Sequence, residues 1–293
     1  KKALNNPTQI HGILDIHQIN HTKVNLLNIW KEEVEIELGK ATKNGGEYAL
    51  KSLESAVNHL KENKIDVLLT APINKETIQS ETFNFPGHTE FLEESLHGKS
   101  LMILMTNALK IGLITGHIPI SKVAETVTPE LIKEKVAIMQ HSLQQDFGIR
   151  KPKIAILGLN PHNGDKGVIG QEEDLIIKPT VDALKESGLL VFGPYAADGF
   201  FGAKTYTQFD GILAMYHDQG LAPFKALSFG NGVNFTAGLS GIRTSPDHGT
   251  GFEIAGKNTA DNTSFKEALF TAIAVFKARK EYEELTKNPL KKK

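Results

Sequence analysis

Residues 211–220 read Gly211-Ile-Leu-Ala-Met-Tyr-His-Asp-Gln-Gly220, and this stretch indicates the fold class. It begins with an apolar run of the length of a buried strand, and polar residues with a glycine follow at once. The chain repeats this arrangement, because short apolar runs alternate with amphipathic stretches of helical spacing. Strands that alternate with helices predict an α/β protein with a mainly parallel sheet.

The other predicted elements extend outward from this stretch. Further strands are predicted over residues 65–70, 101–105, 110–115, 153–159 and 189–192. Helices are predicted over residues 46–63, 128–147, 171–187 and 264–284. The helix at 128–147 has Thr128 as its N-cap and proline at its first position. The last helix has Phe265, Leu269, Ala272, Ile273 and Phe276 on one face.

Composition excludes several classes of function. The chain has 293 residues, 40% hydrophobic and 23% charged, so it can bury a core and does not have the composition of a disordered protein. A formal net charge of −1 argues against nucleic-acid binding, and no apolar run reaches the roughly 18 residues of a membrane span. Cysteine is absent, which excludes disulfides, thiolate zinc sites and a cysteine nucleophile. We expect a cytoplasmic protein.

Histidines follow three of the predicted strands. His117 comes after residues 110–115, and His162 and His217 follow two later strands in the same way. If these strands are parallel neighbours, the three imidazoles meet at one edge of the sheet. Neutral imidazoles with open coordination positions suit a divalent metal that polarises a substrate oxygen. Any one of these histidines taken alone is an ordinary surface or capping residue.

Glycine-rich segments near the C-terminus contain residues suited to an anion. Lys225, Asn234 and Arg243 lie among glycines, and Arg and Lys beside such backbone suit a phosphate or a carboxylate. Surface charge on turns is the alternative. Residues 247–261 are also rich in small side chains, which let a backbone approach a ligand closely. No strand-linked G-x-G-x-x-G and no P-loop motif occurs, so a nicotinamide cofactor needs another binding mode.

Six stretches resemble, in order, the PdxA family of pyridoxal phosphate biosynthesis, the 4-hydroxythreonine-4-phosphate dehydrogenases. They are residues 71–75 (APINK), 85–91 (FPGHTEF), 158–164 (GLNPHNG), 214–220 (AMYHDQG), 232–234 (GVN) and 243–250 (RTSPDHGT). Several long motifs in the family's order are highly specific, and the resemblance covers the chain from about residue 65 to residue 261.

The resemblance implies the two-domain fold of isocitrate and isopropylmalate dehydrogenases, with a cleft between the domains. Residues 1–85 and 235–293 would form a first α/β domain on the cofactor side, and residues 86–234 a second one with the metal and substrate loops and the dimer contacts. The family's opening strand and Gly-Asp-Pro-x-Gly-Ile-Gly-Pro-Glu loop have no counterpart here. Residues 1–20 resemble a part well inside the first domain, so we expect the sequence to begin late within it.

The resemblance also implies site residues. A divalent metal (zinc, magnesium, cobalt, manganese or nickel) is expected on His117, His162 and His217, in a homodimer whose metal sites are completed across the interface. Substrate contacts map onto His88, Thr89, Lys225, Asn234 and Arg243, with His88 and Thr89 at the phosphate. NAD or NADP is expected at His248, Gly249, Thr250, Ile254, Ala255, Gly256, Lys257 and Asp261. Asp247 and Lys225 are the candidate general bases, and Lys75 is either a site residue or a surface lysine. Asp218 is either a partner of His217 or a helix cap.

The implied reaction is NAD-dependent oxidation and decarboxylation of 4-phosphooxy-L-threonine to 3-amino-2-oxopropyl phosphate, in pyridoxal 5'-phosphate (vitamin B6) biosynthesis. One alternative is a related dehydrogenase for a phosphorylated four-carbon sugar acid, such as threonate or erythronate 4-phosphate, which lacks the amine. Another is a metal-dependent lyase or a phosphate-binding protein on the same scaffold. None of these readings predicts a nucleic-acid or membrane partner.

Overall fold

The computed structural model describes residues 9–81 and 83–288. The strands in these ranges are β1 (Ile10–Ile13), β2 (Val24–Leu27), β3 (Leu68–Leu69), β4 (Gly98–Met105), β5 (Lys110–Leu113), β6 (Ile154–Leu157), β7 (Val191–Tyr195), β8 (Gly211–Ala214), β9 (Val233–Leu239) and β10 (Arg243–Pro246). The α-helices are α1 (Lys43–Lys61), α2 (His88–Ser95), α3 (Val123–Thr126), α4 (Pro129–Gln145), α5 (Lys178–Glu186), α6 (Ala197–Gly202), α7 (His217–Ser228) and α8 (Thr263–Thr286). Shorter helical turns are η1 (Ile16–Gln18), η2 (Ile120–Lys122), η3 (Pro161–Asp165), the π-helical η4 (Glu173–Ile177), η5 (Thr205–Gln208) and η6 (Phe252–Ile254).

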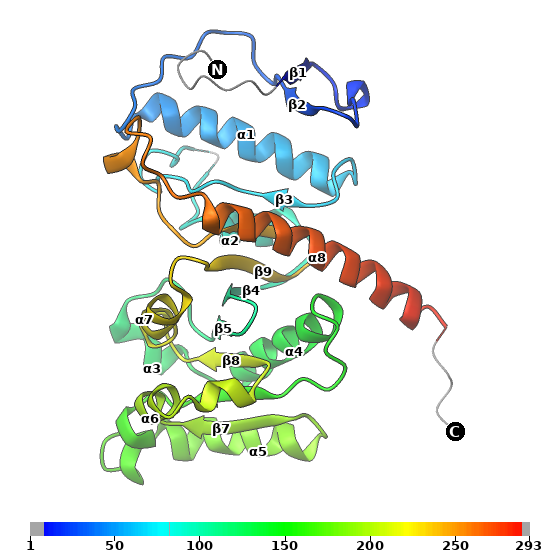
Figure 1. The fold of residues 1–293 in the computed structure, drawn as a ribbon. Coiled ribbons are helices and arrows are strands. Elements are labelled where there is room, and N and C mark those ends of the chain that lie inside the picture. The colour runs from blue at the N-terminus through cyan, green and yellow to red at the C-terminus, as the bar shows by residue number, and fades with distance from the viewer. Residues whose placement is uncertain (1–8, 82, 289–293) are drawn as a thin grey trace.

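One sheet of eight strands passes through the described part of the chain, in the order β3-β10-β9-β4-β5-β8-β6-β7, and β1 and β2 form a separate parallel pair (Figure 1). The run β5-β8-β6-β7 is parallel, and so is the pair β3-β10. Strand β9 is antiparallel to both β10 and β4, and β4 is antiparallel to β5. The sheet is therefore mixed, and the prediction of a mainly parallel sheet is wrong for its middle. The connections from β4 to β5 and from β9 to β10 are short, and only antiparallel strands can be joined by such tight turns.

Helices cover both faces of this sheet, because its central strands are apolar on both sides. Along β6, Ile154 and Ile156 belong to the core under α4, α5 and α8. The alternate residues, Ala155 and Leu157, belong to the core on the other face, which α6 and α7 cover. At the β3 end, α1 and α2 pack around a third apolar cluster that includes Leu53. The result is a layer of strands between two layers of helices.

Helix α8 buries only part of its predicted apolar face: Ala272 is fully buried and Phe276 packs against the core. Phe265, Leu269 and Ile273 are each about 40% exposed. The buried positions of α8 are Ser264, Ala268, Ala272, Val275 and Arg279. Most of these side chains are small, so the helix axis lies close to β9 and β10, and the Thr244 hydroxyl donates a hydrogen bond to the Ala268 carbonyl at 2.8 Å. Close approach to the sheet therefore decides which face is buried.

None of the helices in the described ranges is both long enough and apolar enough to cross a membrane.

Candidate functional site

A cavity of about 360 Å³ lies on one face of the sheet, over β4, β9 and β10 and between the N-terminus of α2 and helix α7. The strands contribute Met102, Leu104, Asn234, Arg243, Ser245 and Pro246 to its lining. The helices contribute His88, Thr89, Glu90, His217, Leu221 and Lys225, with Gly87 just before α2. Loops after β3, β5 and β10 complete it with Pro72, Ile73, Lys75, His117, Asp247, His248 and Gly249. The cavity thus unites all the predicted substrate residues and two of the predicted metal ligands.

Arg243 is a buried cation on the floor of this cavity. It begins β10 and is only 3% exposed. Its guanidinium donates hydrogen bonds to the hydroxyls of Thr70, at 2.8 and 3.1 Å, and Thr236, at 3.3 Å. In the described ranges no carboxylate lies within ion-pair distance of Arg243. The Glu90 carboxylate of the same cavity offsets only part of the effect of burial, which lowers the pKa of Arg243 to about 10. A buried charge without a counterion is costly unless an anion arrives to pair with it.

Histidine 88 is a neutral group beside this cation. It is half-buried at the first position of α2. Burial, together with the positive charge of Arg243, lowers the pKa of His88 to about 3. The imidazole is therefore uncharged at neutral pH. It lies at the N-terminus of α2, where the first backbone N–H groups of the helix have no partner within the helix. Such N-termini favour anions.

Glu90 is a carboxylate of the cavity that sequence reasoning did not assign to the site. Its Oε1 lies 3.6 Å from Nδ1 of His117, and this contact holds the pKa of Glu90 below its usual range. Its Oε2 is buried and has no hydrogen-bond partner among the described residues. Glu90 lies inside the motif at 85–91. In the sequence, its position directly after the predicted substrate contacts His88 and Thr89 was the only indication that it belongs to the site.

Asn234 and Asp247 complete the polar lining of the cavity. The Oδ1 of Asn234 is buried without a hydrogen-bond partner in the described part of the chain, so it is ready for a donor on a ligand. The Nζ of Lys225 donates to the backbone carbonyl and to Oδ1 of Asp247, both at 3.0 Å. The hydroxyl of Ser264, at the start of α8, accepts from the Asp247 N–H at 3.0 Å. The two candidate general bases therefore form one ion pair, and Ser264 at the start of α8 holds the backbone of Asp247.

Two of the three predicted metal ligands come together. The rings of His117 and His217 have centroids 5.3 Å apart. The Nδ1 of His217 lies 2.7 Å from Oδ1 of Asp218, so this nitrogen donates to the carboxylate and Nε2 takes no part in that bond. This is the contact that a partner of His217 would make, and the role of Asp218 toward a metal stays a prediction.

The third predicted ligand, His162, does not join them. Strands β5, β8 and β6 are parallel neighbours, which was the condition for convergence. Nevertheless His162 is exposed and absent from the cavity lining, and no group of three His, Cys, Asp or Glu side chains in the described ranges is placed to hold a metal. The expectation that all three imidazoles meet within one chain is wrong. The reason is local: His162 lies in a left-handed turn that leads it away from the edge of β6.

This turn is strained. His162, Asn163, Asp165 and Lys166 have φ between 44° and 56°, and the glycines at 164 and 167 are also in the left-handed region. The left-handed conformation costs an L-residue roughly 1–2 kcal/mol, although Asn, Asp and His tolerate it best. A run of such residues persists only where surrounding contacts impose it, and such strain concentrates at functional sites.

The predicted cofactor residues divide between two cavities. His248 and Gly249 line the cavity described above. Thr250 and Ala255 line a neighbouring cavity of about 430 Å³, between the segment 30–42, the start of α1 and η6. Gly256 packs beside this second cavity, because a Cβ there would lie 3.2 Å from Leu38. Both cavities share Pro72 and Ile73, so they adjoin.

Ile254, Lys257 and Asp261 line neither cavity. Instead, Oδ1 of Asp261 accepts hydrogen bonds from the N–H and the hydroxyl of Thr263 at the start of α8. These bonds hold the pKa of Asp261 below its usual range. In this structure Asp261 therefore organises a helix start.

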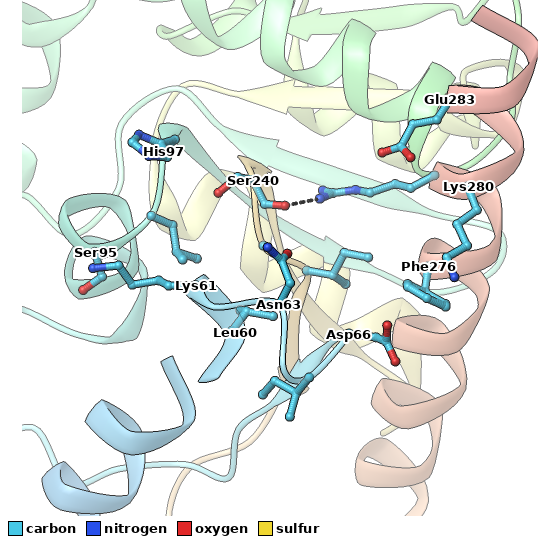
Figure 2. A pocket seen from close by; sticks show the side chains of 15 residues that line it. Leu60, Lys61, Asn63, Asp66, Ser95, His97, Ser240, Phe276, Lys280 and Glu283 are labelled. Carbon is cyan, nitrogen blue, oxygen red and sulfur yellow. Dashed lines mark hydrogen bonds between the residues drawn. The ribbon is translucent and has the colours of Figure 1, made fainter. Parts of the chain in front are cut away.

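A larger cavity, of about 440 Å³, lies at the opposite ends of β3 and β10, between α1, α2 and α8 (Figure 2). Its rim carries the exposed side chains of two lysines, two acidic residues and one histidine: Lys61, Lys280, Asp66, Glu283 and His97. None of the predicted site residues lines it. Ligands of α/β proteins bind at the carboxyl ends of parallel strands, and this cavity faces the amino ends of β3 and β10. The smaller cavity, with its buried unpaired groups, is the better candidate.

Comparisons with known proteins show the family to which the chain belongs. The family model described as pyridoxal phosphate biosynthetic protein PdxA matches residues 1–272. The 4-hydroxythreonine-4-phosphate dehydrogenase of Bacteroides thetaiotaomicron is 50% identical over 294 aligned positions, which cover 100% of this chain and 81% of the relative. A protein of the same name from Sulfurihydrogenibium is 43% identical over 288 positions, 96% of this chain and 88% of the relative. The crystal structure of 4-hydroxythreonine-4-phosphate dehydrogenase from Klebsiella pneumoniae has a TM-score of 0.78 at 32% identity, covering 94% of this chain and 86% of that one.

Proposed function

The chain belongs to the PdxA family of pyridoxal phosphate biosynthetic proteins, and from this premise we propose that it oxidises 4-hydroxythreonine 4-phosphate with NAD or NADP and releases CO₂. The product is 3-amino-2-oxopropyl phosphate. The family assignment confirms the resemblance carried by the six sequence motifs. The relatives' shared name supplies the substrate, and the chemistry of the cavity supports it.

The buried charge of Arg243, which forms no ion pair in the described ranges, is the main support for this proposal. Together with Lys75 and Lys225 it gives the cavity three cationic side chains, and the substrate brings a phosphate and a carboxylate. At about 360 Å³ the cavity has the size of a small-molecule site. We place the phosphate at His88, Thr89 and the N-terminus of α2, and the carboxylate near Arg243 and Asn234.

We further propose that the metal site is shared between two subunits. The donor set within one chain is two imidazoles, which is too few for the three-histidine site, whereas the exposed His162 is free to reach a second copy. His117 and His217 would hold the metal with His162 of the partner subunit. A divalent metal supplies a Lewis acid at the substrate hydroxyl and at the oxygen that becomes an enolate.

The two adjoining cavities support a binding mode for the cofactor. We propose that its adenosine end lies near Thr250 and Ala255 and that its nicotinamide reaches the substrate past Pro72 and Ile73. A nicotinamide bound there would supply the hydride acceptor. The pair of Asp247 and Lys225 borders the cavity. The Asp247 carboxylate can accept the hydroxyl proton, and Lys225, whose side chain is 54% exposed, donates to this carboxylate and holds it in place.

Turnover of two substrates separates the proposal from its nearest alternative. We expect NADH from 4-hydroxythreonine 4-phosphate and little from threonate or erythronate 4-phosphate, in which a hydroxyl replaces the amine. The reverse preference would assign the chain to a sugar-acid branch of the family. Absence of NAD binding would favour a lyase or a phosphate-binding protein.

Mixing two inactive variants tests the shared site. His162→Ala and His217→Ala should each abolish metal-dependent turnover. In a heterodimer of the two, one site combines an intact pair with an intact His162 of the partner subunit, and the other site loses both. Random reassociation makes about half of the dimers mixed, so about a quarter of wild-type activity should return, as expected for an isologous dimer. No recovery would contradict the sharing. His21→Ala, at an exposed histidine on the N-terminal segment, is the matched control and should stay fully active.

A further inference from the structure

The turn that carries His162 needs something to hold it. Six consecutive residues, 162–167, have φ of 53°, 56°, 74°, 44°, 56° and 88°. Four of them are not glycine, so the chain alone does not favour this conformation. Backbone bonds within the turn, such as the Ile169 N–H to the Gly164 carbonyl at 3.0 Å, close it but do not tie it to the rest of the protein.

A single buried carboxylate fastens the base of this turn. Glu173 is 2% exposed and begins the π-helical turn η4. Its Oε1 accepts hydrogen bonds from the N–H groups of Leu159 and Asn160, both at 2.6 Å. Its Oε2 accepts from the side-chain amide of Asn160 at 2.9 Å. These are the residues that connect β6 to the left-handed turn, so the three bonds tie the start of the turn to η4.

The turn also fits closely against this carboxylate. A Cβ on Gly164 would lie closest to the Gly170 carbonyl oxygen and 2.8 Å from Oε2 of Glu173. One on Gly158 would lie closest to Oδ1 of Asn163 and 3.2 Å from Oε1 of Glu173. On the other side, the amide of Asn163 donates to the Pro194 carbonyl at 3.0 Å. The buried part of the loop is therefore fixed by Glu173 and Asn163, while the His162 side chain is left exposed.

We propose that Glu173 is a positioning residue of the reaction: it holds the turn so that His162 is presented to the metal site of a second subunit. This inference rests on the proposed function, because it assumes that the site is shared. Glu173 touches neither substrate nor metal and acts only through the backbone of residues 159–160 and the turn that follows.

Glu173→Gln is the direct test, because an amide keeps the size but turns one acceptor into a donor that faces the Asn160 amide. We expect zinc alone, titrated into the metal-free dimer by calorimetry, to bind roughly 10- to 100-fold more weakly, the usual effect of losing an orienting partner. Asp174→Asn, the neighbouring exposed carboxylate, is the matched control and should bind zinc like the wild type. Zinc affinity unchanged in Glu173→Gln would overturn the proposal.

Complementation shows whether Glu173 acts on His162 or merely on folding. These mixtures are assayed at a zinc concentration that loads the wild type but not Glu173→Gln. Mixed with His217→Ala, Glu173→Gln should then recover about a quarter of wild-type activity, and mixed with His162→Ala it should recover none, since both then lack a presented His162. Recovery with His162→Ala would contradict the proposal. If His162→Ala and His217→Ala themselves fail to complement, the shared site is wrong instead. Should Glu173→Gln not fold, Gly164→Ala disturbs the same turn, because its methyl group would meet the Gly170 carbonyl oxygen as well as Oε2 of Glu173, and it should give the same pattern.

Discussion

At the scale of single residues, the cavity is defined by groups that are buried before a ligand arrives. Arg243 is a cation without a carboxylate partner in the described ranges, and Asn234 and Glu90 each have a buried oxygen without a hydrogen-bond partner there. Each of these groups loses solvation on folding and regains little from the protein. Together they favour a ligand with both anionic and hydrogen-donating groups, and a phosphorylated amino acid has both.

Replacing Arg243 by alanine should weaken substrate binding. A hydrogen bond to a charged group contributes roughly 1.5–3 kcal/mol, so we expect KM for the phosphorylated substrate to rise roughly 10- to 100-fold. Steady-state kinetics with the substrate varied at saturating cofactor measures this. Arg150→Ala removes an exposed arginine and is the control, with KM expected to stay at the wild-type value. An unchanged KM in Arg243→Ala would remove Arg243 from the substrate site.

His88 should make the protein less stable in acid. Its pKa is about 3 in the folded protein, against 6.5 for the unperturbed group. Between these two pH values the imidazole is protonated in the unfolded chain and neutral in the folded protein. The stability that His88 contributes is complete above pH 6.5 and is lost as the pH falls toward 3, by at most about 1.4 kcal/mol per pH unit.

Urea unfolding of the wild type and of His88→Gln at several pH values between 7.5 and 5 measures this effect. The free energy of unfolding should fall more steeply with decreasing pH in the wild type, because glutamine does not titrate. Parallel curves for the two proteins would show that His88 is not held neutral.

Residue types and motifs predicted many of the residues around this cavity, and the residues that they missed were missed for physical reasons. His88, Thr89, Lys225, Asn234 and Arg243 lie around one cavity as the family resemblance implied. Glu90 was not singled out, because its importance lies in burial and in an unpaired oxygen, which a sequence does not display. Glu173 lies thirteen residues after Asn160, with no pattern linking them, and only the folded chain brings them into contact.

At the scale of elements, α8 shows how packing overrides apolar periodicity. The helix has large apolar residues on several sides, so hydrophobicity does not single out one face. Its contact with β9 and β10 selects the side with Ala268, Ala272 and Val275, and Phe270 is left 62% exposed. Strands β9 and β10 were equally hard to predict, because glycines at 232, 238 and 241 make the segment resemble a ligand loop.

Two truncations on α8 test this orientation. Val275→Ala removes two buried methyl groups and should lower the free energy of unfolding by roughly 1–3 kcal/mol. Phe270→Ala removes a whole ring and should change it by no more than about 0.5 kcal/mol, because the ring is exposed. Chemical denaturation of both variants compares them. A larger loss for Phe270→Ala would mean that the helix buries its large apolar face.

At the scale of the whole molecule, a mixed sheet brings two sets of residues together. Arg243, in the β3-β10 pair, and His117 and His217, after β5 and β8, come from strands of opposite direction. The antiparallel strands β9 and β4 join these two parts, and the cavity lies over them. The alternation of strands and helices predicted the class of fold, but it could not give strand direction. The division into domains at residues 85 and 234 stays a prediction.

The central claim is that this cavity oxidises 4-hydroxythreonine 4-phosphate with a nicotinamide cofactor and a metal held by histidines. The most direct test follows NADH formation by absorbance with this substrate, with and without a chelator, and after zinc, magnesium or cobalt is restored. The account predicts NADH that disappears with the chelator and returns with metal. NADH formation that no chelator affects would contradict the metal site, and no NADH under any of these conditions would contradict the proposed reaction.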